Sequence, residues 1–255
     1  MAPVDLDGSV LCVNTGSATV KCARFEVAGD DDPRETARVE RPAGPTALQD
    51  ALAALADTGA TSVGLVAHRV VHGGPHLVDH CVVDGEVLDA LRAAIEFAPL
   101  HLGAEIAAIE AVAALHPDAV QVACFDTAFH RTMPLVARRL PLPQSLHDAG
   151  VRRFGFHGLS CEYVVGAVGA ATLGRCVIAH LGGGASLTAV RDGRSVDTTM
   201  GLTPTGGVVM ATRTGDLDPG VILHLLRSGM AADEVEDLVT RGGGLLALSG
   251  ETADM

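Results

Sequence analysis

The sequence is poor in aromatic residues and in basic charge. It contains no Trp, one Tyr and six Phe among 255 residues, so Ala, Val and Leu must fill any core, which suits close packing of helices on a sheet. Its 18 Lys and Arg residues stand against 31 Asp and Glu, a formal net charge of −13. Proteins that bind nucleic acid need clustered cations for the phosphates, so this balance argues against a nucleic-acid partner.

Long apolar runs are also missing. No uncharged stretch is both long enough and apolar enough to span a bilayer, and the first seven residues lack the basic and apolar regions of a signal peptide. A hydrophobic content of 48% with 19% charged residues is ordinary for a folded chain and wrong for a disordered one. The sequence therefore predicts a soluble, cytoplasmic globular protein with no membrane partner.

No C-x-x-C pair occurs among the six cysteines. Most of these cysteines lie in apolar or periodic segments, where a free thiol behaves as a small hydrophobic side chain. We therefore expect core thiols in preference to a structural zinc site or a disulfide.

Predicted strands alternate with predicted helices, which is typical of an α/β protein. Residues 10–27 and 176–190 each combine an apolar strand, a turn rich in Gly and Ser, and a second strand. Because one such unit stands near the head of each half, the sequence indicates an internal duplication. Further strands are expected at 63–67 and 120–125. Helices are expected to start at residue 46 and to span 86–97, 102–115 and 160–173, the last of these capped by Ser160. Another helix, capped by Asp218, is expected from residue 219 to Gly229.

Two of the turns carry groups that can hold phosphate. Residues 14–21 (N-T-G-S-A-T-V-K) combine an amide, hydroxyls, a glycine and a lysine, but they do not form a Walker loop. Residues 180–186 (H-L-G-G-G-A-S) place three consecutive glycines between two strands, which weakens a sheet unless the backbone must approach a ligand. Ordinary hairpin turns remain the alternative for both segments.

Isolated charged residues follow the predicted strands. Arg69 comes directly after a buried strand, where a cation suits an anionic substrate. Asp126 ends the strand at 120–125, on the edge where open α/β sheets bind ligands, although a capping role is equally compatible. Arg213 precedes a helix, and residues 152–158 (R-R-F-G-F-H-G) bring two cations and a histidine together. This collection favours phosphoryl transfer, which needs positioning and charge neutralisation more than a nucleophilic side chain.

A metal site at the regularly spaced histidines is not expected. His68, His72, His76 and His80 recur at every fourth residue, but this spacing joins ligands only on a helix. The intervening Gly73-Gly74-Pro75 prevents a continuous helix there.

The motifs taken together resemble those of the acetate kinase family. The resemblance includes the two turns, residues 152–158, and the segment around Arg213, T-R-T-G-D-L-D-P-G. It also includes four further segments: A-H-R-V-V-H-G-G, A-P-L-H, V-A-C-F-D-T-A-F-H-R-T-M-P and D-T-T-M-G-L-T-P. They stand in the family's order from about Val10 to the end of the chain. The resemblance implies an α/β fold of duplicated ribonuclease-H-like domains, as in actin and sugar kinases, with domains at 1–149 and, incomplete, at 150–255. It also implies reversible phosphoryl transfer from ATP to acetate or propionate, dependent on Mg²⁺ or Mn²⁺. Because a partly built second domain would leave strands and apolar helix faces uncovered, we expect a homodimer or other self-association.

The resemblance assigns roles residue by residue. The catalytic residues would be Asp126, His157 and Arg213, and the metal would lie at Asn14 and Asp126. The substrate would be bound by Arg69, Val71, Leu100 and Pro204. The nucleotide ATP or ADP would be bound by Ser17, Thr19, Lys21, His180, Leu181, Gly182, Gly183, Gly184, Asp254 and Met255.

Several positions depart from the family pattern. Gly183 stands where the family has Asn, which removes a side-chain donor to the nucleotide, and Ala18 replaces a hydroxyl residue. The family's later Gly-Gly-Ile-Gly-Glu adenosine loop and a metal-site Glu are not found in the sequence. A second hypothesis is therefore a catalytically impaired remnant that retains a substrate or phosphate pocket.

Overall fold

The computed structural model describes residues 8–16, 18–28, 32–58 and 63–254. Contacts between residues divide the chain into two compact units, Met1–Phe125 and Asp126–Met255. The domain boundary predicted at residues 149 and 150 stays a prediction, since compactness alone does not define the copies of a duplication. No helix in the described part of the chain is long and apolar enough to cross a membrane.

The first unit is built on a mixed sheet with strand order β3-β2-β1-β4-β6-β5. Strands β1, β2 and β3 run antiparallel in succession, whereas β4 pairs parallel with β1 and with β6. The carboxyl ends of β1 and β4 therefore lie side by side at one edge. The strands are β1 (Gly8–Thr15), β2 (Thr19–Val27), β3 (Arg34–Pro42), β4 (Val63–Val70), β5 (Cys81–Val82) and β6 (Val120–Phe125).

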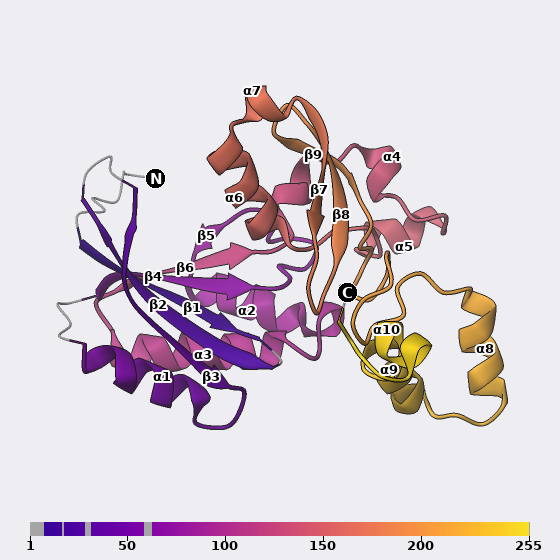
Figure 1. Ribbon diagram of the computed structural model, residues 1–255, viewed down its shortest axis with the longest axis horizontal. Helices are drawn as coiled ribbons and strands as arrows, with labels where there is room; N and C mark the ends of the chain where they lie inside the picture. The colour runs from indigo at the N-terminus through magenta and orange to yellow at the C-terminus, as the bar shows by residue number, and fades with distance from the viewer. Residues whose placement is uncertain (1–7, 17, 29–31, 59–62, 255) are drawn as a thin grey trace. The chain divides into compact units, whose positions relative to one another are not determined.

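Helices α1 (Ala47–Ala56) and α3 (Leu102–Leu115) cover one face of this sheet (Figure 1). The apolar stripe expected on α1 is confirmed, because Leu48, Leu52 and Leu55 are all buried. They pack with α3 and with inward side chains of β1, β2 and β4 in one hydrophobic cluster. Helix α2 (Gly85–Ala93) is capped by Asp84, whose carboxylate accepts from the Val87 N–H, and packs against α3.

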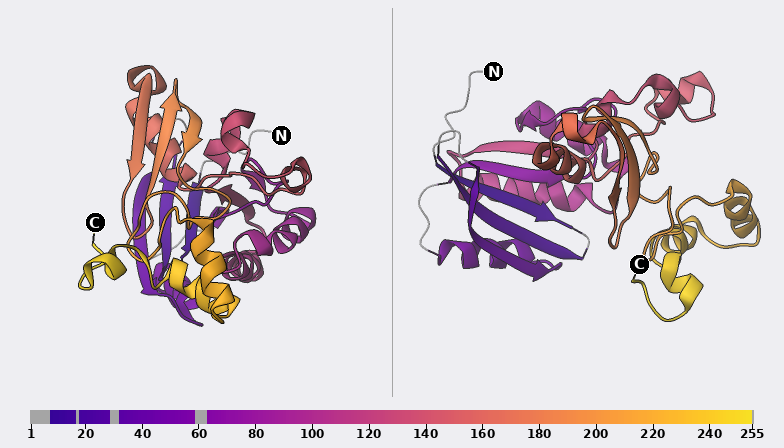
Figure 2. Two further views of the ribbon diagram at one scale, coloured as in Figure 1. Left: turned by 90° about the vertical axis from the view of Figure 1, so that its right-hand side faces the viewer. Right: turned by 45° about the horizontal axis from the view of Figure 1, so that its top comes forward.

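The second unit contains an antiparallel sheet of order β7-β8-β9, whose strands run side by side in Figure 2. Its core joins Ile178 and Val190 of the sheet to Cys161 of α6 (Gly158–Val168) and to Phe129. The expected strand–turn–strand units are thus confirmed in both halves. The remaining elements are β7 (Arg175–His180), β8 (Ser186–Arg191), β9 (Arg194–Thr198), η1 (Ile95–Phe97), η2 (Ala128–Thr132), α4 (Leu135–Arg138), α5 (Gln144–Asp148), α7 (Ala170–Leu173), α8 (Pro219–Arg227), α9 (Ala232–Thr240) and α10 (Gly244–Ser249).

Two of the predicted helices differ from the structure at their ends. Ser160 does not cap the helix expected at 160–173, because α6 begins at Gly158 with His157 at the N-cap position. That helix also breaks at Gly169, whose positive φ of 87° separates α6 from α7. The helix expected at 86–97 ends at Ala93, and a short 3-10 turn follows. By contrast, Asp218 caps α8 as predicted, since its carboxylate accepts from the Gly220 N–H.

The six cysteines are free thiols, as the sequence predicts. Cys22 and Cys161 are fully buried, and the other four are half-buried. Burial is also the main reason that the pKa of Cys22 rises to about 11, which keeps this thiol protonated and unreactive.

Candidate functional site

In the first unit, two predicted site residues meet at the sheet edge. Because β1 and β4 are parallel neighbours, with Val13 aligned to His68, the next residues Asn14 and Arg69 emerge side by side. Nη1 of Arg69 donates to Oδ1 of Asn14 at 3.0 Å. The guanidinium predicted to bind the substrate is therefore held by the amide predicted to lie near the metal and phosphates.

The first predicted phosphate turn is closed by its own backbone. The Gly16 N–H donates to the Thr19 carbonyl oxygen at 2.8 Å. Lys21 lies on the exposed side of β2, where its Nζ is 3.3 Å from the Glu40 carboxylate. Ser17 lies outside the described residues, so its predicted role stays a prediction.

The predicted acyl-pocket residues of the first unit lie in two segments. Val71 follows β4 and is buried at 3% exposure, whereas Leu100 precedes α3 and is 42% exposed. The backbone N–H of Val71 donates to Oε2 of Glu105 at 3.0 Å. Glu105 is a buried carboxylate of α3, at 2% exposure, that sequence reasoning missed. The available signal was a carboxylate on the otherwise apolar face of this helix.

In the second unit, His157 has a constrained backbone. It precedes α6 in the left-handed region, with φ 61° and ψ 23°, which a non-glycine residue adopts only where its surroundings enforce it. Its Nδ1 lies 3.0 Å from Oγ of Ser186, and its ring stacks on that of His180 with the centroids 4.0 Å apart. Nδ1 of His180 lies 3.0 Å from Oγ of Ser160. Two hydroxyls that sequence reasoning did not assign to the site thus orient both imidazoles.

Gly184 brings the turn between β7 and β8 against two predicted catalytic side chains. A Cβ at this position would lie 3.2 Å from Nε2 of His157 and 3.3 Å from Nη1 of Arg213. The same Nη1 of Arg213 donates to the Pro204 carbonyl oxygen at 3.0 Å. The structure therefore gathers residues predicted for catalysis, nucleotide binding and substrate binding around one glycine. Leu181, Gly182 and Gly183 are exposed at the tip of this turn.

Asp126 is buried at 3% exposure directly after β6. Its carbonyl oxygen accepts from the Gly158 N–H at 2.7 Å, so its backbone is tied to the start of α6, next to His157. A Cβ on Gly158 would lie 2.3 Å from that oxygen, which explains the glycine. Asp254 is exposed near the end of the chain, and Met255 lies outside the described residues.

The described residues contain no group of three or more His, Cys, Asp and Glu side chains placed to hold a metal ion. Asp126 of the second unit is a buried carboxylate and Asn14 of the first unit is an amide. Each offers an oxygen of the kind that Mg²⁺ takes, together with waters and substrate phosphates, in sites that are not all-protein cages.

The regularly spaced histidines have separate hydrogen-bonding roles. Nε2 of His68 lies 2.7 Å from Oε1 of Gln121, and burial lowers the pKa of His68 to about 4 although this contact opposes the shift. His72 accepts from the Gly74 N–H at 2.8 Å, and His80 from the Phe125 N–H at 3.0 Å, each through Nδ1.

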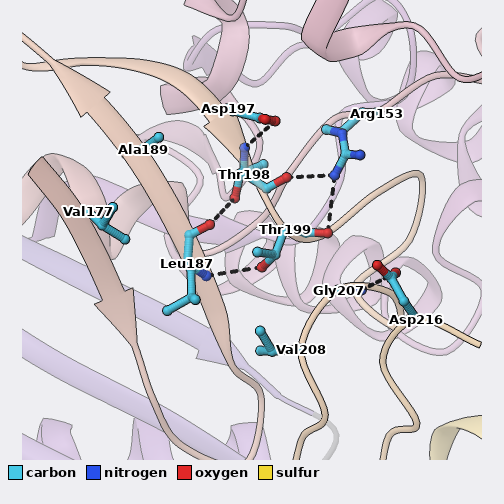
Figure 3. Close-up of a pocket in the computed structure, with 10 residues that line it drawn as sticks. All are labelled: Arg153, Val177, Leu187, Ala189, Asp197, Thr198, Thr199, Gly207, Val208 and Asp216. Carbon is cyan, nitrogen blue, oxygen red and sulfur yellow. Dashed lines mark hydrogen bonds between the residues drawn. The ribbon is translucent and has the colours of Figure 1, made fainter.

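A pocket of about 510 Å³ lies in the second unit, over β8 and β9 (Figure 3). Its polar groups are already engaged. Nη1 of Arg153 donates to the carbonyl oxygens of Thr198 at 2.6 Å and Thr199 at 3.2 Å, and Oδ1 of Asp216 accepts from the Gly207 N–H at 2.7 Å. None of the predicted site residues is among the residues that line it.

Comparison with known proteins gives matches along almost the whole chain. The model of the Acetokinase family matches residues 9–255. An acetate kinase of Rhodopseudomonas palustris (strain TIE-1) is 51% identical over 196 residues, covering 74% of this chain and 49% of the relative. One from Thermosynechococcus vestitus is 43% identical over 250 residues, covering 91% of this chain and 60% of the relative. The chain thus spans about half to three fifths of the length of these relatives.

Solved structures agree in fold. A propionate kinase from Francisella tularensis superposes with a TM-score of 0.83 at 32% identity, over 97% of this chain and 71% of that chain. The acetate kinase of Porphyromonas gingivalis gives a TM-score of 0.79, also at 32% identity and with the same shares of the two chains. The predicted α/β fold of the actin and sugar-kinase type is confirmed by these likenesses.

Proposed function

Because the chain belongs to the acetokinase family, we propose that it transfers the γ-phosphoryl group of ATP reversibly to the carboxylate of acetate or propionate. A carboxylate oxygen forms a bond to the γ-phosphorus while the bond to the bridging oxygen breaks, so that an acyl phosphate and ADP result. The observation that carries this proposal is the convergence of His157 and Arg213 on Gly184.

The second unit would stabilise the group in transit. The phosphoryl group becomes planar during transfer and its charge spreads over three equatorial oxygens. The imidazole Nε2 of His157 and the guanidinium of Arg213 would donate to these oxygens, and Ser186 would keep Nε2 of His157 facing them. Fixed donors of this kind typically account for a factor of about 10² to 10³ in turnover each. The glycine turn would leave space for the nucleotide phosphates and offer them its N–H groups.

The first unit would hold the acceptor. The guanidinium of Arg69 would bind the substrate carboxylate, and Val71 and Leu100 would wall its short acyl chain, a role that the resemblance also gives to Pro204. Thr19 and Lys21 would contact the nucleotide phosphates. A valine and a proline at these positions permit either acetate or propionate.

Mg²⁺ fits the proposal as a partner of the nucleotide. When bound, it would neutralise charge on the β- and γ-phosphates, and Asn14 and Asp126 would hold it directly or through water. Alternatively, the carboxylate of Asp126 would act as the acid or base, taking the proton from an acceptor that enters as the carboxylic acid and returning it in the reverse reaction. A cytoplasmic location, where ATP is available, and self-association of the chain complete the proposal.

Trapping of acetyl phosphate as its hydroxamate tests this function. Purified protein with Mg-ATP and acetate is expected to form hydroxamate at a rate that depends on both substrates, and Arg213→Ala should lower that rate by about a hundredfold or more. Arg227→Ala on α8 removes the same charge from an exposed helix and should leave the rate unchanged. Acetate-independent product, or equal rates in the wild type and Arg213→Ala, would contradict the proposal.

A further inference from the structure

Glu105 is a buried carboxylate on the core face of α3. It shares this face with Leu102, Ile106, Ile109 and Val112, all of which are buried. An aliphatic residue would be buried there at no electrostatic cost, whereas a carboxylate needs hydrogen bonds in compensation. The side chain of Glu105 therefore serves a contact that an apolar residue cannot make.

That contact is with the backbone that follows β4. Strand pairing between β4 and β6 ends at Val70, so the N–H of Val71 lies just beyond the ladder and is buried. Oε2 of Glu105 accepts from this N–H at 3.0 Å. A backbone donor at a strand end would otherwise lose its hydrogen bond to water on burial, and a carboxylate is a strong acceptor for it.

The backbone of Glu105 is joined to a second segment. The N–H of Glu105 donates to the carbonyl oxygen of His101 at 3.1 Å, which places it one helical turn after the residue that follows Leu100. Beyond Val71 the chain is also confined, because a Cβ on Gly73 would lie 2.0 Å from the Leu77 carbonyl oxygen. Glu105 thus links the two segments, through its side chain at Val71 and through its backbone at His101, the residue that follows Leu100.

We propose that Glu105 is a positioning residue that sets the separation of Val71 and Leu100, and with it the length of acyl chain that the carboxylate pocket admits. This inference rests on the proposed function, since Val71 and Leu100 are walls of that pocket. Glu105 is not among the residues proposed to touch the reacting atoms. It acts through the backbone of Val71 and, two residues away, through the placement of Arg69.

Three variants of Glu105 test the proposal by their effect on KM and on substrate choice. Glu105→Gln keeps an acceptor of the same reach and should behave as the wild type. Glu105→Met keeps the volume but loses the acceptor, so the KM for acetate should rise about tenfold while the KM for ATP stays constant. The ratio of kcat/KM for acetate to that for propionate should change about fivefold or more. Glu105→Asp, one carbon shorter, should shift this ratio even if Glu105→Met folds poorly.

Glu110→Gln is the matched control. Glu110 lies on the same helix but is exposed, where it pairs with Arg92 at 2.6 Å, so its loss should change neither KM nor the substrate ratio. A purely structural role for Glu105 would lower stability without separating the two KM values. An unchanged KM for acetate and an unchanged ratio in Glu105→Met and Glu105→Asp would overturn the proposal.

Amide hydrogen exchange separates this inference from the proposed function. Exchange at Val71 should quicken by about tenfold or more in Glu105→Met and stay slow in Glu105→Gln, whether or not the protein turns over. If the wild type forms no acyl phosphate, the proposed function fails, and acetate and propionate affinities measured by calorimetry replace KM in the comparison. Equal exchange at Val71 in all variants would refute the contact itself.

Discussion

At the scale of single residues, His157 shows how the second unit keeps a strained backbone. A non-glycine residue in the left-handed region costs about 1–3 kcal/mol. The strain persists because the next residue is fixed, with the Gly158 N–H bonded to the Asp126 carbonyl oxygen, and because the His157 ring is held by Ser186 and His180. The strained backbone lowers the stability of the fold, and it fixes the direction of the His157 imidazole.

His68 makes stability depend on pH. Its pKa is about 4 in the folded state against 6.5 for the exposed side chain, so between these values the unfolded chain binds a proton that the folded chain does not. The free energy of unfolding should therefore fall as the pH drops from about 6.5 to about 4, by up to about 3 kcal/mol from this residue. Above a pH of about 6.5 its contribution is fully present. Denaturant unfolding at a pH of about 7.5 and at a pH of about 5 measures the difference.

The matched variants are His68→Gln and His224→Gln. Glutamine at position 68 can still contact Gln121 but does not titrate, so the loss of stability between the two pH values should shrink. His224 is exposed on α8, and its replacement should leave the pH dependence as in the wild type. Burial also lowers the pKa of His130. In His68→Gln the stability should therefore still fall somewhat as the pH drops. An undiminished loss in His68→Gln would contradict the assignment.

At the scale of elements, the turn between β7 and β8 depends on the small size of Gly184. In Gly184→Ala the new Cβ would lie 3.2 Å from Nε2 of His157 and 3.3 Å from Nη1 of Arg213. Both groups would be displaced by a few tenths of an ångström, and the methyl group would fill space meant for phosphate oxygens. We expect hydroxamate formation to fall about tenfold to a hundredfold, with the thermal midpoint nearly unchanged.

Gly166→Ala provides the control for this substitution. Gly166 lies in α6 and is exposed, and a methyl group on its Cα would meet no atom within 4 Å. Alanine there should raise the free energy of unfolding by about 0.4–1 kcal/mol, because it reduces the conformational entropy of the unfolded chain. It should leave turnover unchanged. Equal activity of Gly184→Ala and Gly166→Ala would show that the close approach has no functional consequence.

Elements rich in apolar residues and bounded by helix-breaking residues were predictable from sequence, and those whose pattern was obscured by charge were not. Helix α3 was expected at 102–115 and lies at Leu102–Leu115. Strand β3 was missed because its sequence, RETARVERP, is mostly charged, although Ala37 and Val39 alternate inward and pack on the core. The start of α6 was misplaced because a serine is a better cap than a histidine by propensity, whereas the backbone of Asp126 decides it here.

The same limit applies to the candidate site. Motif spacing identified Arg69, His157 and Arg213 as candidates, because charged residues in loops and at strand ends are typical of ligand-binding sites. It did not identify Glu105 or Ser160, because their importance lies in contacts with residues distant in sequence, at Val71 and His180. Hydrogen bonds of that kind follow from the packing of elements, which a local pattern does not contain.

At the scale of the whole molecule, exposed apolar side chains predict self-association. Val177 on β7 is 63% exposed, and Leu248 on α10 is 77% exposed. Large apolar side chains that are exposed to water favour association between molecules where they form one contiguous patch. Light scattering at increasing concentration should give an average mass above 26.1 kDa, and Val177→Glu with Leu248→Glu should return it toward that value. A constant mass of one chain at all concentrations would rule this out.

Each unit has a hydrophobic cluster of its own, around Leu11 and Leu52 in the first and around Phe129 and Ile178 in the second. A ligand raises the melting temperature of the structure to which it binds by mass action, in proportion to the logarithm of its concentration over its Kd. When the melting of each cluster is followed by itself, thermal denaturation therefore reports where a ligand binds. A carboxylate that engages Arg69 should delay melting of the first unit, and a phosphate held at Gly184 should delay melting of the second.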